Sequence, residues 1–166
     1  MRASGNADGI ATNATAATPS GTGIVFDGGT GTVYGSVTLQ EDLEIGEGES
    51  LNIPDGSSLT IPDDKTLTVN GGELTGNVPQ SGVTYKVTEV TLSQSNLTLG
   101  VGESETLTAT ITPDNATEQD VTWSSDPSGI VDITPDTADS KEATITATGT
   151  GTTTIKATVD GKSAEC

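Results

Sequence analysis

The residues of this sequence that could do chemistry are its carboxylates. Its 166 residues include 24 aspartates and glutamates, 6 lysines and arginines, and no histidine. Without histidine, the chain cannot form the Ser–His and Cys–His pairs that activate many protein nucleophiles. Two neighbouring carboxylates, such as Asp63 and Asp64, could in principle hydrolyse a glycosidic bond. Adjacent acids also arise by chance in so acidic a chain, and we therefore expect a protein that is not an enzyme.

Carboxylates can also bind calcium, a hard cation that takes oxygen ligands. Four aspartates lie around two expected turns: Asp126, Asp132, Asp136 and Asp139. The EF-hand loop pattern is absent. Residues 28–33 begin like a calcium-binding β-roll repeat but have Val33 where the ligand aspartate belongs. We interpret the four aspartates as solvated turn residues, with calcium binding as the weaker alternative, and we predict no cofactor.

The charge and the hydropathy of the chain limit its partners. A formal net charge of −18 excludes ordinary nucleic-acid binding, because phosphates are neutralised by clusters of lysine and arginine. No run of about 18 apolar residues is present, so we expect no membrane insertion. Cys166 is the single cysteine, which excludes a disulfide within the chain.

Aromatic side chains that could stack on a sugar ring are few. They make up 2% of the residues and are Phe26, Tyr34, Tyr85 and Trp123. Trp123 alternates with Val121 along an expected strand, which places it in a protein core rather than on a binding platform. A glycan- or receptor-binding module stays open as an alternative function.

Residues 22–85 contain a repeat of eight residues. Each unit has two apolar residues two positions apart, followed by a turn rich in glycine, proline and aspartate. This spacing places both side chains on one face of a short strand, and such short strands must stack to become stable. We predict a short β-solenoid, with an antiparallel meander of small hairpins as the alternative. The predicted core residues are Leu43, Ile45, Leu51, Ile53, Leu59, Ile61, Leu67 and Val69.

Residues 86–166 have a different pattern, with seven longer segments in which apolar and polar residues alternate. Each segment is an expected strand, and one of them contains Leu97 and Leu99. Turn residues such as Asp126–Gly129 and Asp160–Gly161 separate them. This pattern predicts an antiparallel β-sandwich. Its predicted core contains Leu107, Ile111, Trp123, Ile145 and Ile155. Residues 1–21 are small, polar and without a period, and we expect a linker or a disordered segment there.

Several motifs of the C-terminal half resemble the bacterial Ig-like domain of group 2. They are Val101-Gly102-Glu103, Leu107-Thr108-Ala109, residues 113–117 (Pro-Asp-Asn-Ala-Thr), residues 121–125 (Val-Thr-Trp-Ser-Ser) and the Gly-rich turn and strand at 147–158. Together with the repeat, they predict an all-β protein in which a short solenoid precedes an Ig-like sandwich. Residues 22–85 are also similar to the Leu/Ile-Pro-Gly repeats of surface proteins of Gram-positive bacteria.

The sequence departs from the family pattern at its last strand. Only residues 162–166 are present where the family has a longer apolar strand, so we expect this strand to be truncated and its neighbour to be left with an open edge. Such an edge, together with the thiol of Cys166, predicts a mostly monomeric protein with some dimer.

The resemblance implies a function outside the cytoplasm. Similar domains are spacer or stalk modules of adhesins and of many cell-wall enzymes. We therefore expect a non-catalytic structural or spacer segment of an extracellular or bacterial cell-surface protein, with part of an adhesin stalk as its specific form. Its partners would be neighbouring modules of the full-length protein and an unknown protein or glycan ligand. The alternatives are a glycan- or receptor-binding module and an accessory region of a secreted carbohydrate-active enzyme.

Overall fold

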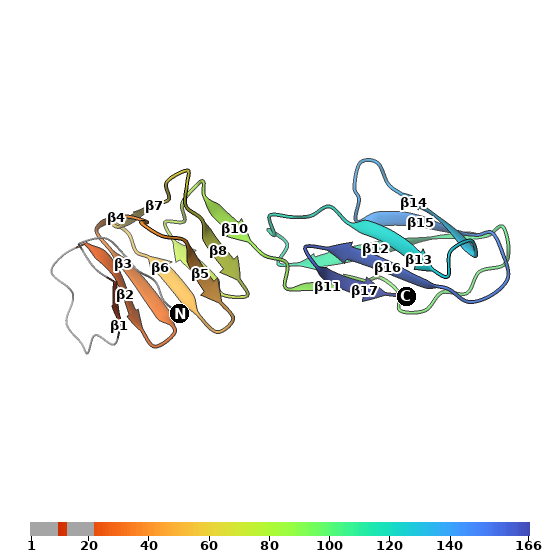
Figure 1. The fold of residues 1–166 in the computed structure, drawn as a ribbon, viewed down its shortest axis with the longest axis horizontal. Helices are drawn as coiled ribbons and strands as arrows, with labels where there is room; N and C mark the ends of the chain where they lie inside the picture. The colour runs from red at the N-terminus through yellow and green to blue at the C-terminus, as the bar shows by residue number, and fades with distance from the viewer. Residues whose placement is uncertain (1–9, 13–21) are drawn as a thin grey trace. The chain divides into compact units, whose positions relative to one another are not determined.

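The computed structural model describes residues 10–12 and 22–166, and most of its strands are labelled in Figure 1. The described residues form strands β1–β17 and no helix, as expected for an all-β chain. No helix that is long and apolar enough to cross a membrane occurs among them. The chain divides into two compact units, Met1–Lys86 and Val87–Cys166, each of which is described separately below.

The N-terminal unit consists of short strands in three sheets. The sheet orders are β1-β2-β3-β6-β9, β4-β7 and β5-β8-β10. The strands are β1 (Ile10–Thr12), β2 (Gly23–Asp27), β3 (Thr30–Tyr34), β4 (Ser36–Thr38), β5 (Leu43–Gly46), β6 (Ser50–Ile53), β7 (Ser58–Thr60), β8 (Leu67–Asn70), β9 (Glu73–Gly76) and β10 (Val83–Tyr85).

Part of the expected linker is a strand. Residues 10–12 form β1, which pairs in parallel with β2. The rest of the predicted linker or disordered segment at 1–21 lies outside the described residues.

Parallel pairing dominates the N-terminal unit. Apart from the β2–β3 hairpin and an isolated antiparallel bridge between Gly46 and Gly71, its ladders among the described residues are parallel. Consecutive strands of the repeat do not pair with one another; β5 pairs with β8, and β6 with β9. The antiparallel meander, offered as the alternative, is therefore wrong. Two parallel strands need a long connection between them. Here β6 and β7 form the connection from β5 to β8, and β7 and β8 form the one from β6 to β9.

The apolar pairs of the repeat form the core of this unit. All eight predicted core residues, from Leu43 to Val69, are buried. Ile24, Phe26, Val33 and Leu39 are buried in the same cluster as most of them. Side chains two positions apart in a strand lie on one face, which explains why both apolar residues of each unit are inside.

The C-terminal unit is an antiparallel β-sandwich. One sheet has the order β11-β12-β15-β14 and the other has the order β13-β16-β17. The strands are β11 (Glu89–Leu92), β12 (Ser104–Thr112), β13 (Thr122–Asp126), β14 (Val131–Pro135), β15 (Glu142–Ala147), β16 (Thr154–Val159) and β17 (Lys162–Glu165). Leu107, Ile111, Ile145 and Ile155 are buried, as alternation along these strands requires.

Trp123 is less enclosed than its position in the strand pattern predicts. It lies in β13 and is half-buried. Its ring packs against two apolar clusters of the sandwich, one around Ala109 and Ala157 and the other around Leu107 and Ile145.

Two expectations about strands of the sandwich are wrong. Leu97 and Leu99, although they alternate with polar residues, lie in an irregular segment between β11 and β12. The last strand does not leave its neighbour open: β17 pairs with Lys156–Val159 of β16. Cys166 extends this pairing, because its N–H and C=O bond the C=O and N–H of Ile155 at 2.9 and 2.8 Å.

Candidate functional site

The four aspartates considered as calcium ligands do not form a metal site. Asp126 ends β13, Asp132 lies within β14, and Asp136 and Asp139 lie in the turn that follows. Among the described residues, no three His, Cys, Asp or Glu side chains are grouped so that they could hold a metal ion.

Asp136 instead stabilises a turn. Its Oδ1 accepts hydrogen bonds from the backbone N–H groups of Ala138 (2.6 Å) and Asp139 (3.1 Å). These two bonds favour the charged carboxylate and lower the pKa of Asp136 below its usual value. Asp139 Oδ1 in turn accepts the N–H of Lys141 at 3.0 Å. Both carboxylates thus have a structural role in the connection from β14 to β15.

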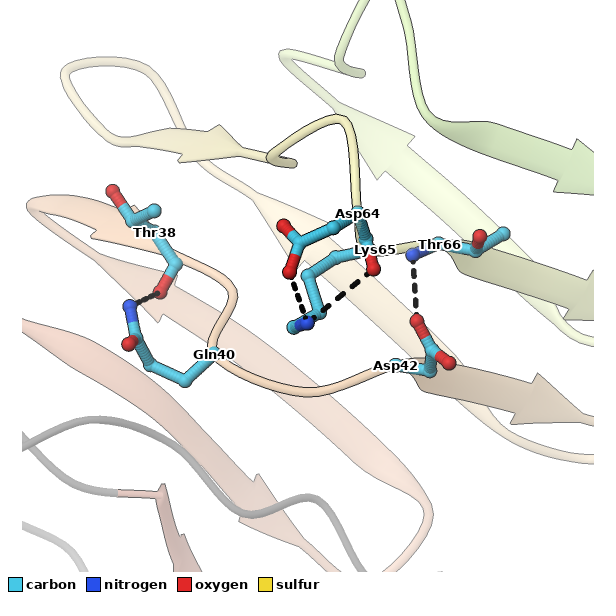
Figure 2. Close-up of polar contacts among 6 residues, drawn as sticks. All are labelled: Thr38, Gln40, Asp42, Asp64, Lys65 and Thr66. Atoms are coloured by element: carbon cyan, nitrogen blue, oxygen red, sulfur yellow. Dashed lines mark hydrogen bonds and ion pairs between the residues drawn. The ribbon is translucent and has the colours of Figure 1, made fainter.

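The Asp63–Asp64 pair, considered above for glycosidic chemistry, lies beside a lysine. Figure 2 shows the Nζ of Lys65 against Asp64, with 2.6 Å between Nζ and Oδ2. The hydrogen bond to Asp64 is the main cause that raises the pKa of Lys65, and it likewise lowers the pKa of Asp64. An exposed ion pair of this kind contributes little stability. A carboxylate held charged in this way is poorly suited to donate a proton as a general acid.

A second contact in Figure 2 joins two neighbouring strands. Asp42 precedes β5, and its Oδ1 accepts the N–H of Thr66, which precedes β8, at 2.8 Å. The same two strands begin their ladder at Leu43 and Leu67, so the carboxylate supports the start of this parallel pairing. This cluster is therefore structural as well.

Aromatic residues are engaged in packing. Phe26 is buried in the N-terminal core. Trp123 donates its indole N–H to the carbonyl oxygen of Ser140 at 2.8 Å, in addition to its packing between two apolar clusters. Tyr34 and Tyr85 are half-buried in the N-terminal unit. Trp123 is therefore not a free stacking platform for a sugar.

A cavity in the C-terminal unit is the strongest candidate for a binding site. Its volume is about 470 Å³, within the range of about 300–1,000 Å³ that is common for ligand sites. We call this cavity the slot. Residues from both sheets and from three connecting segments line it: Asn96, Leu97, Thr98, Leu99, Ile130, Val131, Ile145, Ala147, Gly149, Gly151, Thr152, Thr153, Thr154, Ile155 and Cys166.

The slot is lined by apolar side chains and by uncharged polar ones. Ile145, Ala147 and Ile155 are buried, whereas Leu97 and Leu99 are half-buried. No charged side chain lines it. Cys166 is partly exposed at its margin, and desolvation raises the pKa of its thiol.

Both walls of the slot have backbone groups without partners. Among the described residues, the backbone of residues 95–99 makes no hydrogen bond to other backbone groups, and neither does that of Thr153. The sequence did not predict this site, because the alternation at Leu97 and Leu99 indicated a strand there.

Comparison with known proteins adds to this geometry. A family model described as the bacterial Ig-like domain (group 2) matches residues 86–166. The C-terminal unit is a bacterial Ig-like domain. Domains of this family occur as structural modules in bacterial surface proteins and typically belong to extracellular or surface proteins. The resemblance noted from the motifs is thereby confirmed for the Ig-like domain.

A relative of much greater length was also found. The chain is 43% identical over 75 residues to an uncharacterized protein of Clostridium acetobutylicum. The matched part is 45% of this chain and 7% of that protein. The chain thus spans a small part of the relative, and any activity of the whole relative lies outside this comparison.

Proposed function

We propose that this chain is a non-catalytic structural segment of an extracellular or surface protein of a bacterium. The observation that carries the proposal is the family match at residues 86–166, since domains of this family serve as structural modules. Three carboxylates that were considered for chemistry support it, because Asp64, Asp136 and Asp139 are engaged in local structural contacts. A spacer role within an adhesin stalk is the specific form of this proposal.

A display experiment tests the spacer role. The chain is placed between a bacterial surface anchor and a peptide tag, and the binding of an antibody to the tag is compared with that of a version lacking residues 87–166. A spacer predicts better antibody access with the longer chain. Equal access for both versions would argue against it.

We further propose that the N-terminal unit is a three-sided β-solenoid. The support is its parallel register: Val37 pairs with Leu59 on one side, Leu43 with Leu67 on a second, and Leu51 with Leu74 on the third. In this arrangement, three units of the repeat make one turn. The stacked turns would form a rigid rod without edges between neighbouring turns.

Tandem duplications test the solenoid. A second copy of residues 43–66 adds three units, which is one full turn, and every later strand keeps its side. A second copy of residues 43–50 adds one unit and moves every later strand to another side. The proposal predicts that the first variant retains the melting temperature of the parent and that the second loses it. Equal melting of both variants would refute the three-sided turn.

The slot favours a binding module as the second candidate function, and an accessory region of a secreted carbohydrate-active enzyme would be one form of it. A glycan array with the whole chain separates the candidates. A structural spacer predicts a flat array. A selective signal would support a glycan-binding module instead.

A further inference from the structure

One asparagine of the chain is followed by glycine, and it ends strand β8. The other six asparagines precede alanine, valine, leucine or isoleucine. Asn70 and Gly71 are both exposed. Gly71 has a φ of 79°, a conformation that residues with a Cβ rarely adopt, and Gly72 follows it. The segment after Asn70 is therefore open to solvent and has no side chains of its own.

This arrangement permits a reaction between Asn70 and the backbone that follows it. The nitrogen of Gly71 loses its proton to a base from solvent and attacks Cγ of Asn70. A bond between this nitrogen and Cγ forms, the bond between Cγ and Nδ2 breaks, and ammonia leaves with a proton taken from water. Water then adds to one of the two carbonyl carbons of the cyclic imide, which opens to aspartate or isoaspartate. A side chain at position 71 would crowd the attacking nitrogen, and glycine has none.

The neighbouring strand gives the reaction a structural consequence. Nδ2 of Asn70 donates a hydrogen bond to Oε1 of Glu44 in β5, at 2.9 Å. The β5–β8 ladder ends at the pair of Gly46 and Asn70, so this bond lies at its last pair. Conversion replaces the donor by a second carboxylate, and like charges on adjacent strands are destabilising. Isoaspartate in addition lengthens the backbone at position 70, which disturbs the ladder there.

We propose that Asn70 is a self-modification site, at which the folded protein converts the amide to a carboxylate and the repulsion from Glu44 then loosens the end of the β5–β8 ladder. The reactants are this chain and water. The modification would act as a clock that records the age of the N-terminal unit. It is independent of a spacer role, since either can hold without the other.

Ageing of the whole chain at mildly alkaline pH tests the conversion. Trypsin cleavage after Lys65 and Lys86 releases residues 66–86 as one peptide, which contains both Asn70 and Asn77. Asn77 is the internal control: it is exposed, its Nδ2 donates to the carbonyl oxygen of Pro54 at 3.3 Å, and valine follows it. We expect mass spectrometry to show the change from amide to acid at position 70, increasing with time, before it appears at position 77.

Two results of this experiment would overturn the proposal. One is an unchanged amide at Asn70 in the aged, folded protein. The other is equal conversion of Asn70 and Asn77, because the glycine and the end of β8 would then be irrelevant. A sample digested without ageing corrects both measurements for conversion during the digestion itself.

Variants test the consequence for the ladder. Asn70→Asp reproduces one product, and we expect it to lower the melting temperature of the N-terminal unit. Adding Glu44→Gln to it places an amide on β5 and a carboxylate on β8, which restores the hydrogen bond with donor and acceptor exchanged, and the melting temperature should recover. Equal melting of Asn70→Asp and the parent would refute the repulsion from Glu44.

Asn70→Ser provides the control for ageing, because serine cannot form the imide. Ageing should lower the melting temperature of the parent and leave that of Asn70→Ser unchanged. An equal decline in both proteins would assign the effect of age to another residue and overturn the clock.

Discussion

Leu43 pairs with Leu67, although Leu51 is the next leucine of the repeat. Both partners are buried, with 3% and 0% of their surface exposed. Leu51 lies in a different sheet and pairs with Leu74. The eight-residue period therefore describes the sequence, whereas the pairing has a period of three units. Leu43 and Leu51 thus each pair with a leucine that lies about three units later in the sequence.

The glycine at the end of β9 provides a test of this stacking. Gly76 lies next to Ile53 of β6, and a Cβ at Gly76 would overlap the carbonyl oxygen of Ile53. We expect Gly76→Ala to destabilise the N-terminal unit by the cost of a positive φ, about 1–2 kcal/mol, plus about 1–3 kcal/mol for the overlap. Urea unfolding followed by circular dichroism measures the change.

Gly56→Ala is the matched control for this prediction. Gly56 has the same φ of 83° as Gly76, but nothing lies within 4 Å of a Cβ placed there. The two variants share the strain of the backbone and differ in the contact with the neighbouring strand. If both lose the same stability, Gly76 and Ile53 are not stacked as described.

The sequence was sufficient to predict which residues of the repeat are inside, but not which residues pair. Burial of Leu51 and Ile53 follows from their spacing, since residues two positions apart share a face of a strand. The pairing of Leu43 with Leu67 depends on the path that the chain takes between these two residues. Every unit has similar apolar residues, so the sequence pattern is compatible with several pairings between units.

The slot could not be predicted because it depends on a strand that does not form. Leu97 and Leu99 alternate with polar residues as a strand would, yet their segment has no backbone partner among the described residues. Alternation reports which side chains face the core and carries no information on whether a partner strand exists. The length of the last strand was likewise no guide to its pairing. Although only residues 162–166 follow the turn, Cys166 still forms backbone hydrogen bonds with Ile155.

The indole hydrogen bond of Trp123 predicts a modest loss on substitution by phenylalanine. Trp123→Phe keeps much of the packing but removes the donor to the carbonyl oxygen of Ser140, at 2.8 Å. We expect a loss of about 0.5–1.5 kcal/mol in the free energy of unfolding, measured with urea and circular dichroism. Unchanged stability would mean that water replaces the indole N–H without cost at this half-buried position.

The hydrogen bonds to Asp136 predict a loss of stability in acid. Because the pKa of Asp136 is lowered in the folded protein, its contribution is present above the unfolded value near 3.8 and is lost as the pH falls through the folded value. Asp136→Ala should therefore be less stable than the parent at pH 7, and this difference should shrink below pH 3.8. Urea unfolding at pH 7 and at about pH 3 measures both differences.

Asp132→Ala is the control for Asp136. Asp132 is exposed in β14, and no contact of its side chain occurs among the contacts described above. We expect a smaller loss at pH 7 and little change of that loss with pH. A pH dependence equal to that of Asp136→Ala would assign the effect to the overall negative charge rather than to the turn.

The thiol of Cys166 predicts a reactivity that reports on the slot. Desolvation raises the pKa of this thiol above its usual value of 9.0, so the folded protein holds less thiolate at pH 8 than an unfolded chain does. Since the thiolate is the nucleophile, we expect Ellman's reagent to react more slowly with the native protein than with the urea-unfolded protein. The rate of the native protein should also level off at a higher pH. Faster reaction in the native state, or levelling at a lower pH, would show that the thiol is solvated and that the margin of the slot is more open than the structure indicates.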